Sequence, residues 1–267
     1  MEERVIIKKE NHIAEVILNR TDKLNALDES MMQAIIAAGE DIQNDPSIRV
    51  VVLRGEGRAF CAGIDLSNFD INPEGGIDNM VERTHGIANK WQQCVWVWRS
   101  LDVPVIAAVH GICFGGGLNI MSGADIKYVT PDTRLSILEM KWGIIPDMAG
   151  SQLWRHNVRE DILRELTYTN REFSGIQAVE YGFATHVSEN PTEDARSLAK
   201  VISSKSPSAI VKTKKMFNEA PYLSAADGLK MESVEQEQII RKHNQLEAVF
   251  SSMQKRDGKF ENYREHK

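Results

Sequence analysis

Residues 111–150, GICFGGGLNIMSGADIKYVTPDTRLSILEMKWGIIPDMAG, carry most of the information about fold and function. They contain a triple glycine, 115–117, at the start of a predicted helix, and two acids, Glu139 and Asp147. Glycine lets a backbone approach a ligand closely, and the first N–H groups of a helix have no acceptor within the helix. The glycines indicate either backbone donors for an oxyanion or close packing of the helix.

Two better-known glycine motifs do not fit this stretch. A phosphate-binding P-loop requires a Lys-Ser/Thr pair after its last glycine, but Leu118 and Asn119 follow Gly117. A dinucleotide-binding turn requires G-x-G-x-x-G, but Ile120 stands at the third position after Gly117. The sequence therefore indicates neither nucleotide-binding motif.

Two buried strands are predicted to end beside glycine-bearing turns. Residues 48–53 (IRVVVL) precede the turn-rich segment RGEGRAFCAGIDL, and residues 103–110 (VPVIAAVH) run directly into the triple glycine. Two turns of this kind can bring two backbone N–H groups to one point.

Four segments resemble the crotonase (enoyl-CoA hydratase/isomerase) superfamily: KLNAL at 23–27, FCAGIDL at 60–66, HGICFGGG at 110–117 and LEMKWGIIPD at 138–147. The resemblance covers most of the chain, from about residue 5 to 260. It implies an α/β fold, with a crotonase-like spiral of ββα units over residues 1–191. It also implies that a C-terminal helical region, residues 192–267, builds a trimer interface, often in a dimer of trimers.

The same resemblance implies the residues of the site. The thioester carbonyl would be held by the backbone N–H groups of Ile64 and Gly116. Each preorganised donor of this kind contributes about 3 kcal/mol when an enolate oxygen develops charge. Coenzyme A, as part of the acyl-CoA substrate rather than a bound cofactor, would lie along Asn25, Ala26, Ala62, Gly63, Asp65 and Leu66.

The first of the two glutamates in similar hydratases aligns with Asn119. Hydration asks one group to deprotonate water and another to steer a proton at the α-carbon. The amide of Asn119 can orient a water, as a substrate-binding group, but cannot take its proton. Moving a double bond needs only a base that removes one proton and returns it, or passes it on, at another carbon.

Glu139 shares its parity with Leu135 and Ile137, which predicts an apolar strand face where burial would raise the pKa of its carboxyl. The alternative is a salt-bridged acid at a strand end. Asp147 suits a helix N-cap. Its spacing from Glu139 also resembles that of dienoyl-CoA isomerases, although these carry an acid at the position of Asn119, and a similar Asp is the nucleophile of aryl-CoA dehalogenases.

Composition excludes several function classes. The 267 residues include 32 basic and 38 acidic side chains, and a net charge of −6 gives no support to nucleic-acid binding. The first ten residues lack the apolar core of a signal peptide, and no run approaches the ~20 apolar residues of a membrane span. We expect a cytoplasmic protein that does not enter membranes.

Cysteine and histidine spacing predicts neither disulfides nor a metal site. The three cysteines, Cys61, Cys94 and Cys113, have no C-x-x-C spacing, which indicates a reducing compartment and small buried thiols. The catalytic-thiol alternative lacks a histidine in a recognised motif. The seven histidines show no H-E-x-x-H or other metal-binding spacing.

The order of predicted elements is that of an α/β protein with a helical tail. A loop is predicted at residues 71–76. Trp91, Val95 and Trp98 form a stripe that is either core or a wall of the acyl pocket. Helices are predicted near 28–44, 80–100, 158–169, 174–181 and 225–253, and strands near 5–8, 13–18, 48–53, 103–109, 125–129 and 184–187.

The favoured function is double-bond isomerisation of an enoyl- or dienoyl-CoA. Hydration of a 2-enoyl-CoA is the first alternative, and hydrolysis or decarboxylation of a CoA thioester is also open because related sites vary their chemistry. A catalytically silent acyl-CoA-binding protein is the alternative outside enzymes.

Overall fold

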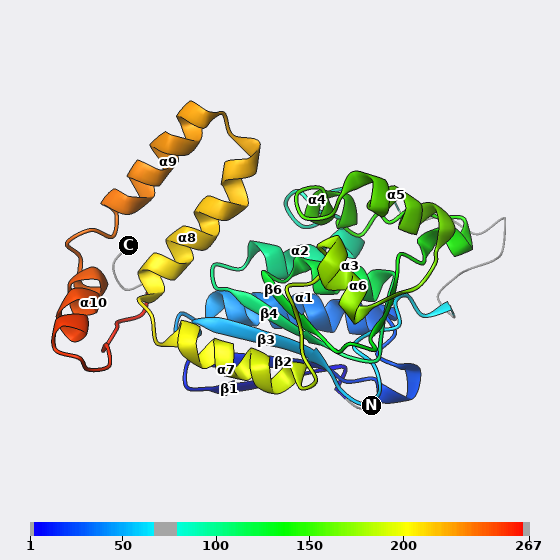
Figure 1. Cartoon of the computed structure of the whole chain (residues 1–267), viewed down its shortest axis with the longest axis horizontal. Coiled ribbons are helices and arrows are strands. Elements are labelled where there is room, and N and C mark those ends of the chain that lie inside the picture. Colours follow the sequence, from blue (N-terminus) through cyan, green and yellow to red (C-terminus); the bar gives the residue numbers. More distant parts are fainter. Residues whose placement is uncertain (1–2, 67–78, 264–267) are drawn as a thin grey trace.

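A computed structural model describes residues 3–66 and 79–263 (Figure 1). The predicted loop at 71–76 lies outside these residues. The strands are β1 (Val5–Glu10), β2 (Ile13–Leu18), β3 (Val50–Gly55), β4 (Val105–Val109), β5 (Ile112–Phe114), β6 (Ile126–Val129), β7 (Arg134–Ser136), β8 (Phe173–Ser174) and β9 (His186–Val187). The helices are α1 (Glu29–Asn44), α2 (Lys90–Ser100), α3 (Gly116–Gly123), α4 (Gly150–Trp154), α5 (Glu160–Thr169), α6 (Gly175–Tyr181), α7 (Pro191–Ser203), α8 (Pro207–Glu219), α9 (Ala225–Glu237) and α10 (His243–Met253), with short 3₁₀ helices η1 (Thr21–Lys23), η3 (Glu139–Trp142) and η4 (Ala220–Tyr222).

The main sheet has the strand order β1-β2-β3-β4-β6-β9, in which β1 and β2 are antiparallel and the other neighbours are parallel. Successive side chains of a strand point to opposite faces. Val50 and Val52 accordingly pack with α7, whereas Val51 and Leu53 join the core that contains α1, α2 and α3. The four consecutive apolar residues at the start of β3, Val50 to Leu53, are therefore buried on both faces of the sheet (Figure 1).

A second sheet has the order β5-β7-β8, with β5 parallel to β7 and β7 antiparallel to β8. Its strands are two or three residues long, too short for hydrophobic alternation to reveal them in the sequence. This small sheet matters for function because β5 leads into α3 and β7 leads toward Glu139.

Two predicted helices have different bounds in the structure. The helix predicted near 80–100 begins at Lys90, where Asn89 and Gln92 form a reciprocal capping box. The continuous helix predicted at 225–253 is wrong, since α9 and α10 are separate and Arg241 between them has a left-handed backbone with φ of 60°. The remaining predicted helices and strands occur close to their expected positions, and the segment after Thr192 is helical as predicted.

The aromatic stripe on α2 is part of the core. Val95 and Trp98 are completely buried, and Trp91 is half-buried against the same cluster. The core interpretation of this stripe is therefore confirmed.

Helices α8, α9 and α10 extend away from the body of the molecule (Figure 1). A buried lysine fastens α8 to the body: the Lys214 ammonium donates to the carbonyls of Trp98 and Val103 and pairs with Asp125 at 2.8 Å. Helix α7 lies inside the C-terminal region expected from the sequence, yet it packs on the main sheet, so the segment that leaves the body begins at α8. Several large apolar side chains of this segment are exposed: Leu229, Val234, Leu246, Val249 and Phe250.

We expect the protein to form a trimer or hexamer in solution, because these apolar side chains need a surface to cover them. Light scattering checks the mass. Replacing both Leu229 and Phe250 with Glu should reduce it, since charged side chains resist burial in an interface. A stable wild-type monomer would contradict the expectation.

Candidate active site

The site is built where two backbone turns meet. The Cys61 N–H donates to Ile112 O and the Phe114 N–H donates to Cys61 O, both at 3.1 Å, so the turn after β3 lies against β5. A Cβ on Gly117 would lie 2.3 Å from Cys61 O, and one on Gly63 would lie 2.7 Å from Phe114 O. Only glycine permits this approach, and Gly63 also needs its φ of +90°.

Two N–H groups are left unused at this junction. In the described ranges neither the Ile64 N–H nor the Gly116 N–H donates a hydrogen bond. Gly116 is the first residue of α3, so its N–H has no acceptor within the helix. The two turns are close enough that a Cβ on Gly63 would lie 3.5 Å from the Gly116 nitrogen. The pair can hold an anionic oxygen.

A cavity of about 310 Å³ opens at these two N–H groups. The structure thereby brings together most of the predicted site, namely Ala26, Ala62, Gly63, Ile64, Asp65, Leu66, Gly116, Glu139 and Asp147. The wall also includes residues that sequence reasoning did not single out: Lys23, Gly115, Leu138, Trp142, Ile144 and Met148. Several of them lie inside the four segments that resemble the crotonase superfamily, so their place in those segments could have identified them as site residues.

Asn25 does not line this cavity. Its side chain is completely buried, accepts a hydrogen bond from the Arg20 N–H, and donates to the carbonyls of Glu56, Ala59 and Phe60. The Asn25 side chain therefore stabilises the turn, and the position of coenzyme A along this turn stays a prediction.

Asp65 lines the cavity with its charge already neutralised. One carboxylate oxygen lies 2.7 Å from the Arg20 guanidinium, and the Asp65 N–H donates to Leu27 O. Leu27 in turn donates to Gly63 O. This ion pair and the two backbone bonds hold the turn that carries the Ile64 N–H.

Glu139 begins the short helix η3 rather than ending a strand as predicted, because β7 stops at Ser136. Its side chain is nevertheless buried, with 7% exposure, and this burial raises the pKa of the carboxyl. One oxygen, Oε1, accepts from the Asn119 amide at 2.9 Å, whereas Oε2 is buried without a hydrogen-bond partner. No ion pair of Glu139 occurs in the described part of the chain, so the salt-bridged alternative is not supported.

Asn119 lies behind Glu139 and not on the cavity wall. It is completely buried on α3, and its amide donates to Gly115 O and to Glu139 Oε1, both at 2.9 Å. The sequence predicted that this side chain contacts substrate or water, whereas in the structure it contacts the Glu139 carboxylate.

Asp147 is not a helix N-cap. The residue that precedes α4 is Ala149, which makes no side-chain cap bond. Asp147 is half-buried, and desolvation raises the pKa of its carboxyl above the ordinary value. Asp147 is thus an ionisable group that does not serve as the helix N-cap that the sequence allowed.

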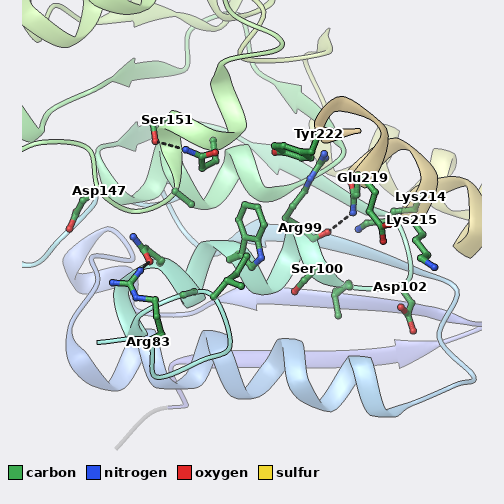
Figure 2. Close-up of a pocket in the computed structure, with 18 of the residues that line it drawn as sticks. Arg83, Arg99, Ser100, Asp102, Asp147, Ser151, Lys214, Lys215, Glu219 and Tyr222 are labelled. Atoms are coloured by element: carbon green, nitrogen blue, oxygen red, sulfur yellow. Dashed lines mark hydrogen bonds between the residues drawn. The ribbon is translucent and has the colours of Figure 1, made fainter. Parts of the chain in front are cut away.

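A larger cavity of about 1200 Å³ also reaches Asp147 (Figure 2). Figure 2 shows Asp147 at one end and Asp102 and Lys214 at the other. Part of the wall is apolar, with Ile87, Ala88, Trp96, Ile145 and Ala149. The cavity wall contributed by α2 includes Trp96 rather than the buried stripe of Val95 and Trp98. Asp147 therefore lines both cavities.

The three cysteines are free and buried. Burial raises the pKa of the Cys61 thiol to about 12, and it raises the pKa values of Cys94 and Cys113 as well. All three are therefore thiols at neutral pH, as expected for packing residues rather than nucleophiles.

Helices long and apolar enough to cross a membrane are absent from residues 3–66 and 79–263. The same residues contain no group of three or more His, Cys, Asp or Glu side chains that would hold a metal ion.

The sequence profile of the enoyl-CoA hydratase/isomerase family matches residues 8–263. The chain belongs to this family. Three curated relatives illustrate its range. The chain is 28% identical to the mitochondrial Delta(3,5)-Delta(2,4)-dienoyl-CoA isomerase of Dictyostelium discoideum, over 91% of this chain and 86% of that protein. It is 29% identical to the peroxisomal enzyme of the same name from Arabidopsis thaliana, over 96% and 95%.

The third relative is the putative enoyl-CoA hydratase/isomerase YngF of Bacillus subtilis, which is 31% identical over 93% of this chain and 94% of that protein. Among solved structures, an enoyl-CoA hydratase from Bacillus anthracis superposes with a TM-score of 0.87 and 26% identity, covering 97% of this chain and 99% of the other. The architecture is thus the α/β crotonase fold with two mixed sheets and C-terminal helices, as the sequence predicted.

We predict that Gly116→Val lowers turnover at least about 10²-fold, the usual cost of losing one oxyanion donor, and weakens acyl-CoA binding. A Cβ at this position would already lie 2.8 Å from the Leu27 Cδ1 and 3.2 Å from the Met148 sulfur, so the valine must displace the cavity wall. Calorimetric titration with a saturated acyl-CoA and a turnover assay provide the measurement.

The matched control is Gly228→Val on α9, where an added Cβ meets no atom within 4 Å. Circular dichroism verifies that both variants are folded. Normal affinity and turnover in a folded Gly116→Val protein would remove the oxyanion assignment.

Proposed function

We propose that this protein is a CoA-thioester double-bond isomerase that converts 3-enoyl-CoA to 2-enoyl-CoA, or 3,5-dienoyl-CoA to 2,4-dienoyl-CoA. The observation that carries the proposal is the pair of desolvated carboxylates, Glu139 and Asp147, in one cavity with the two unused N–H groups of Ile64 and Gly116. A reaction that moves a proton between carbons near a thioester uses bases of this kind together with donors at the thioester oxygen.

In this proposal the thioester oxygen accepts from the Ile64 and Gly116 N–H groups. Removal of a C2 proton leaves an electron pair that delocalises onto this oxygen as an enolate. The two donors stabilise the charge because they are already in place before it develops. Return of a proton at C4 of the enolate, or at C6 of a dienolate, completes the shift with no net change in composition.

The positions of the two acids suggest their separate tasks. The Glu139 carboxylate lies beside the oxyanion turn, since a Cβ on Gly115 would be 3.7 Å from its Oε1. It is therefore assigned to the C2 proton. Asp147 lines both the small cavity and the large one, and the large one offers room for the acyl tail, so Asp147 is assigned to the distal carbon.

Hydration is the second candidate, and the likeness to an enoyl-CoA hydratase structure supports it. Against it stands Asn119, which occupies the position expected for one of the two hydratase acids and is a buried hydrogen-bond donor that cannot accept a proton from water. Hydration here would need Asp147 to replace that acid.

The expectation of a cytoplasmic location remains a prediction.

We expect the wild-type protein to isomerise 3-enoyl-CoA or 3,5-dienoyl-CoA faster than it hydrates 2-enoyl-CoA. Loss of one acid/base group typically costs about 10² to 10⁴ in rate, so a missing hydratase acid should produce a clear difference. Parallel spectrophotometric assays of the three substrates measure it. Efficient hydration of crotonyl-CoA without isomerisation would show that Glu139 and Asp147 activate water.

The assignment of the two acids predicts different defects for Glu139→Gln and Asp147→Asn. In deuterium oxide, Asp147→Asn should still exchange the C2 proton of a dienoyl-CoA while isomerisation falls by about 10² or more. Glu139→Gln should lose both exchange and isomerisation. Nuclear magnetic resonance follows exchange and product together. Retained C2 exchange in Glu139→Gln would reverse the assignment, and loss of neither activity in the two variants would exclude both acids.

A further inference from the structure

The Asn119 side chain connects the two halves of the site. Its Nδ2 atom donates to Gly115 O and to Glu139 Oε1, each at 2.9 Å. The backbone N–H of the same residue also donates to Gly115 O, at 3.0 Å. One completely buried amide thus holds the proposed base and a backbone carbonyl of the oxyanion turn.

The orientation of this amide follows from its partners. Both Gly115 O and the ionised Glu139 Oε1 are acceptors, so the NH₂ end must face them. The reverse orientation would place the amide oxygen against a carbonyl and a carboxylate. The oxygen instead lies buried without a hydrogen-bond partner among the described residues. A buried acceptor left unpaired is costly, which indicates that the two contacts on the nitrogen side are strong enough to fix the group.

The contact with Gly115 O reaches the oxyanion donor through the peptide plane. Gly115 C=O and Gly116 N–H belong to one peptide unit, which is planar, so fixing the direction of the carbonyl fixes the direction of the N–H. A carbonyl that accepts hydrogen bonds also polarises its own N–H, which makes it a better donor. Asn119 therefore acts on the Gly116 N–H as well as on Glu139.

Given the proposed function, we propose that Asn119 is a positioning residue that sets the proton affinity of Glu139 and aims the Gly116 N–H, so that Oε2 alone transfers the proton. It binds Oε1 and leaves Oε2, which is buried and unpartnered, as the reactive oxygen. The donor favours the ionised form of Glu139, opposing the effect of burial.

Few other charges act on Glu139. Asp147, from the loop before α4, raises the pKa of Glu139 by like-charge repulsion, and Lys23 of η1 lines the same cavity. Helix α3 carries no ionisable side chain. Helix α5 packs against η3, and several of its ionisable side chains are engaged in hydrogen bonds at the surface, namely Glu160, Asp161, Arg164, Glu165 and Tyr168.

The first test measures the Glu139 carboxyl directly. Carbon-13 resonance titration, assigned with Glu139→Gln, gives its pKa in the wild type, in Asn119→Leu and in Asn119→Asp. The leucine removes the donor at similar volume, so the pKa should rise by about one unit or more. The aspartate adds a like charge, so the pair should titrate in two separated steps. Where isomerisation is measurable, the acid limb of the kcat/KM profile should lie at higher pH in Asn119→Leu than in the wild type, and at higher pH again in Asn119→Asp.

The second readout concerns the oxyanion half. The infrared carbonyl stretch of bound, carbon-13-labelled butyryl-CoA should lie below its value in water for the wild type. In Asn119→Leu it should return toward that value, because the Gly116 N–H is less well aimed and less polarised.

Ser122→Ala is the matched control on the same helix. Ser122 is buried, donates to Leu118 O and accepts from the Trp154 indole, and neither of these hydrogen bonds involves Gly115 or Glu139. It should lower thermal stability while leaving the Glu139 titration and the carbonyl stretch unchanged.

An unchanged Glu139 pKa and an unchanged carbonyl stretch in a folded Asn119→Leu protein would overturn the proposal. If Asn119→Leu does not fold, the titration of Asn119→Asp decides the question, and a Glu139 titration unchanged from the wild type would overturn the proposal. Neither readout requires turnover, so an inactive wild type would refute the isomerase function without affecting this test.

Discussion

The close contact between the turn after β3 and the turn after β5 is the constraint on which the site depends. Parallel strands β3 and β4 end at the same edge of the main sheet, and hydrogen bonds through Cys61 join the turn after β3 to β5 beyond that edge. The contact leaves no room for a Cβ at Gly63 or Gly117. Two N–H groups become available because the chain bends away there from any backbone partner. A larger residue at either glycine would separate the turns and the donors together.

The buried and half-buried carboxylates of this protein include two kinds, those paired with a cation and those contacted by a neutral group. Asp65 and Asp125 face a guanidinium and an ammonium, at 2.7 and 2.8 Å, and so hold a turn and a helix in place. Glu139 is buried, forms no ion pair with any residue that the structure describes, and is contacted by a neutral amide. Burial raises the pKa of its carboxyl, whereas hydrogen bonds from its own backbone and from the Asn119 amide oppose this rise. A cation paired with Glu139 would lower the pKa of its carboxyl and so weaken it as a base for the proposed proton transfer.

The two cavities give the C-terminal segment a part in the proposed acyl site. The large cavity is bounded by α2 on one side and by α8 and η4 on the other, and its near end is Asp147 (Figure 2). The buried Lys214 that fastens α8 therefore also determines the size of this space. Changes in the helical tail should alter acyl selectivity more than the chemistry at C2, because the oxyanion turns lie in the separate small cavity.

The sequence by itself determined the strands and helices whose periodicity is long enough to detect, the glycine turns, and the identities of the two acids. The order of the four motifs along the chain was enough to predict the family. The tertiary structure alone decided which side chains face the cavity. Asn25 and Asn119 look alike as polar residues beside glycine motifs, yet both turn inward, because carbonyls and a carboxylate from distant parts of the chain are their partners. Glu139 faces the site from a 3₁₀ helix that alternation could not reveal, and Asp147 lines both cavities from the loop before α4. Contacts between residues far apart in sequence leave no local pattern, and these contacts set both burial and proton affinity.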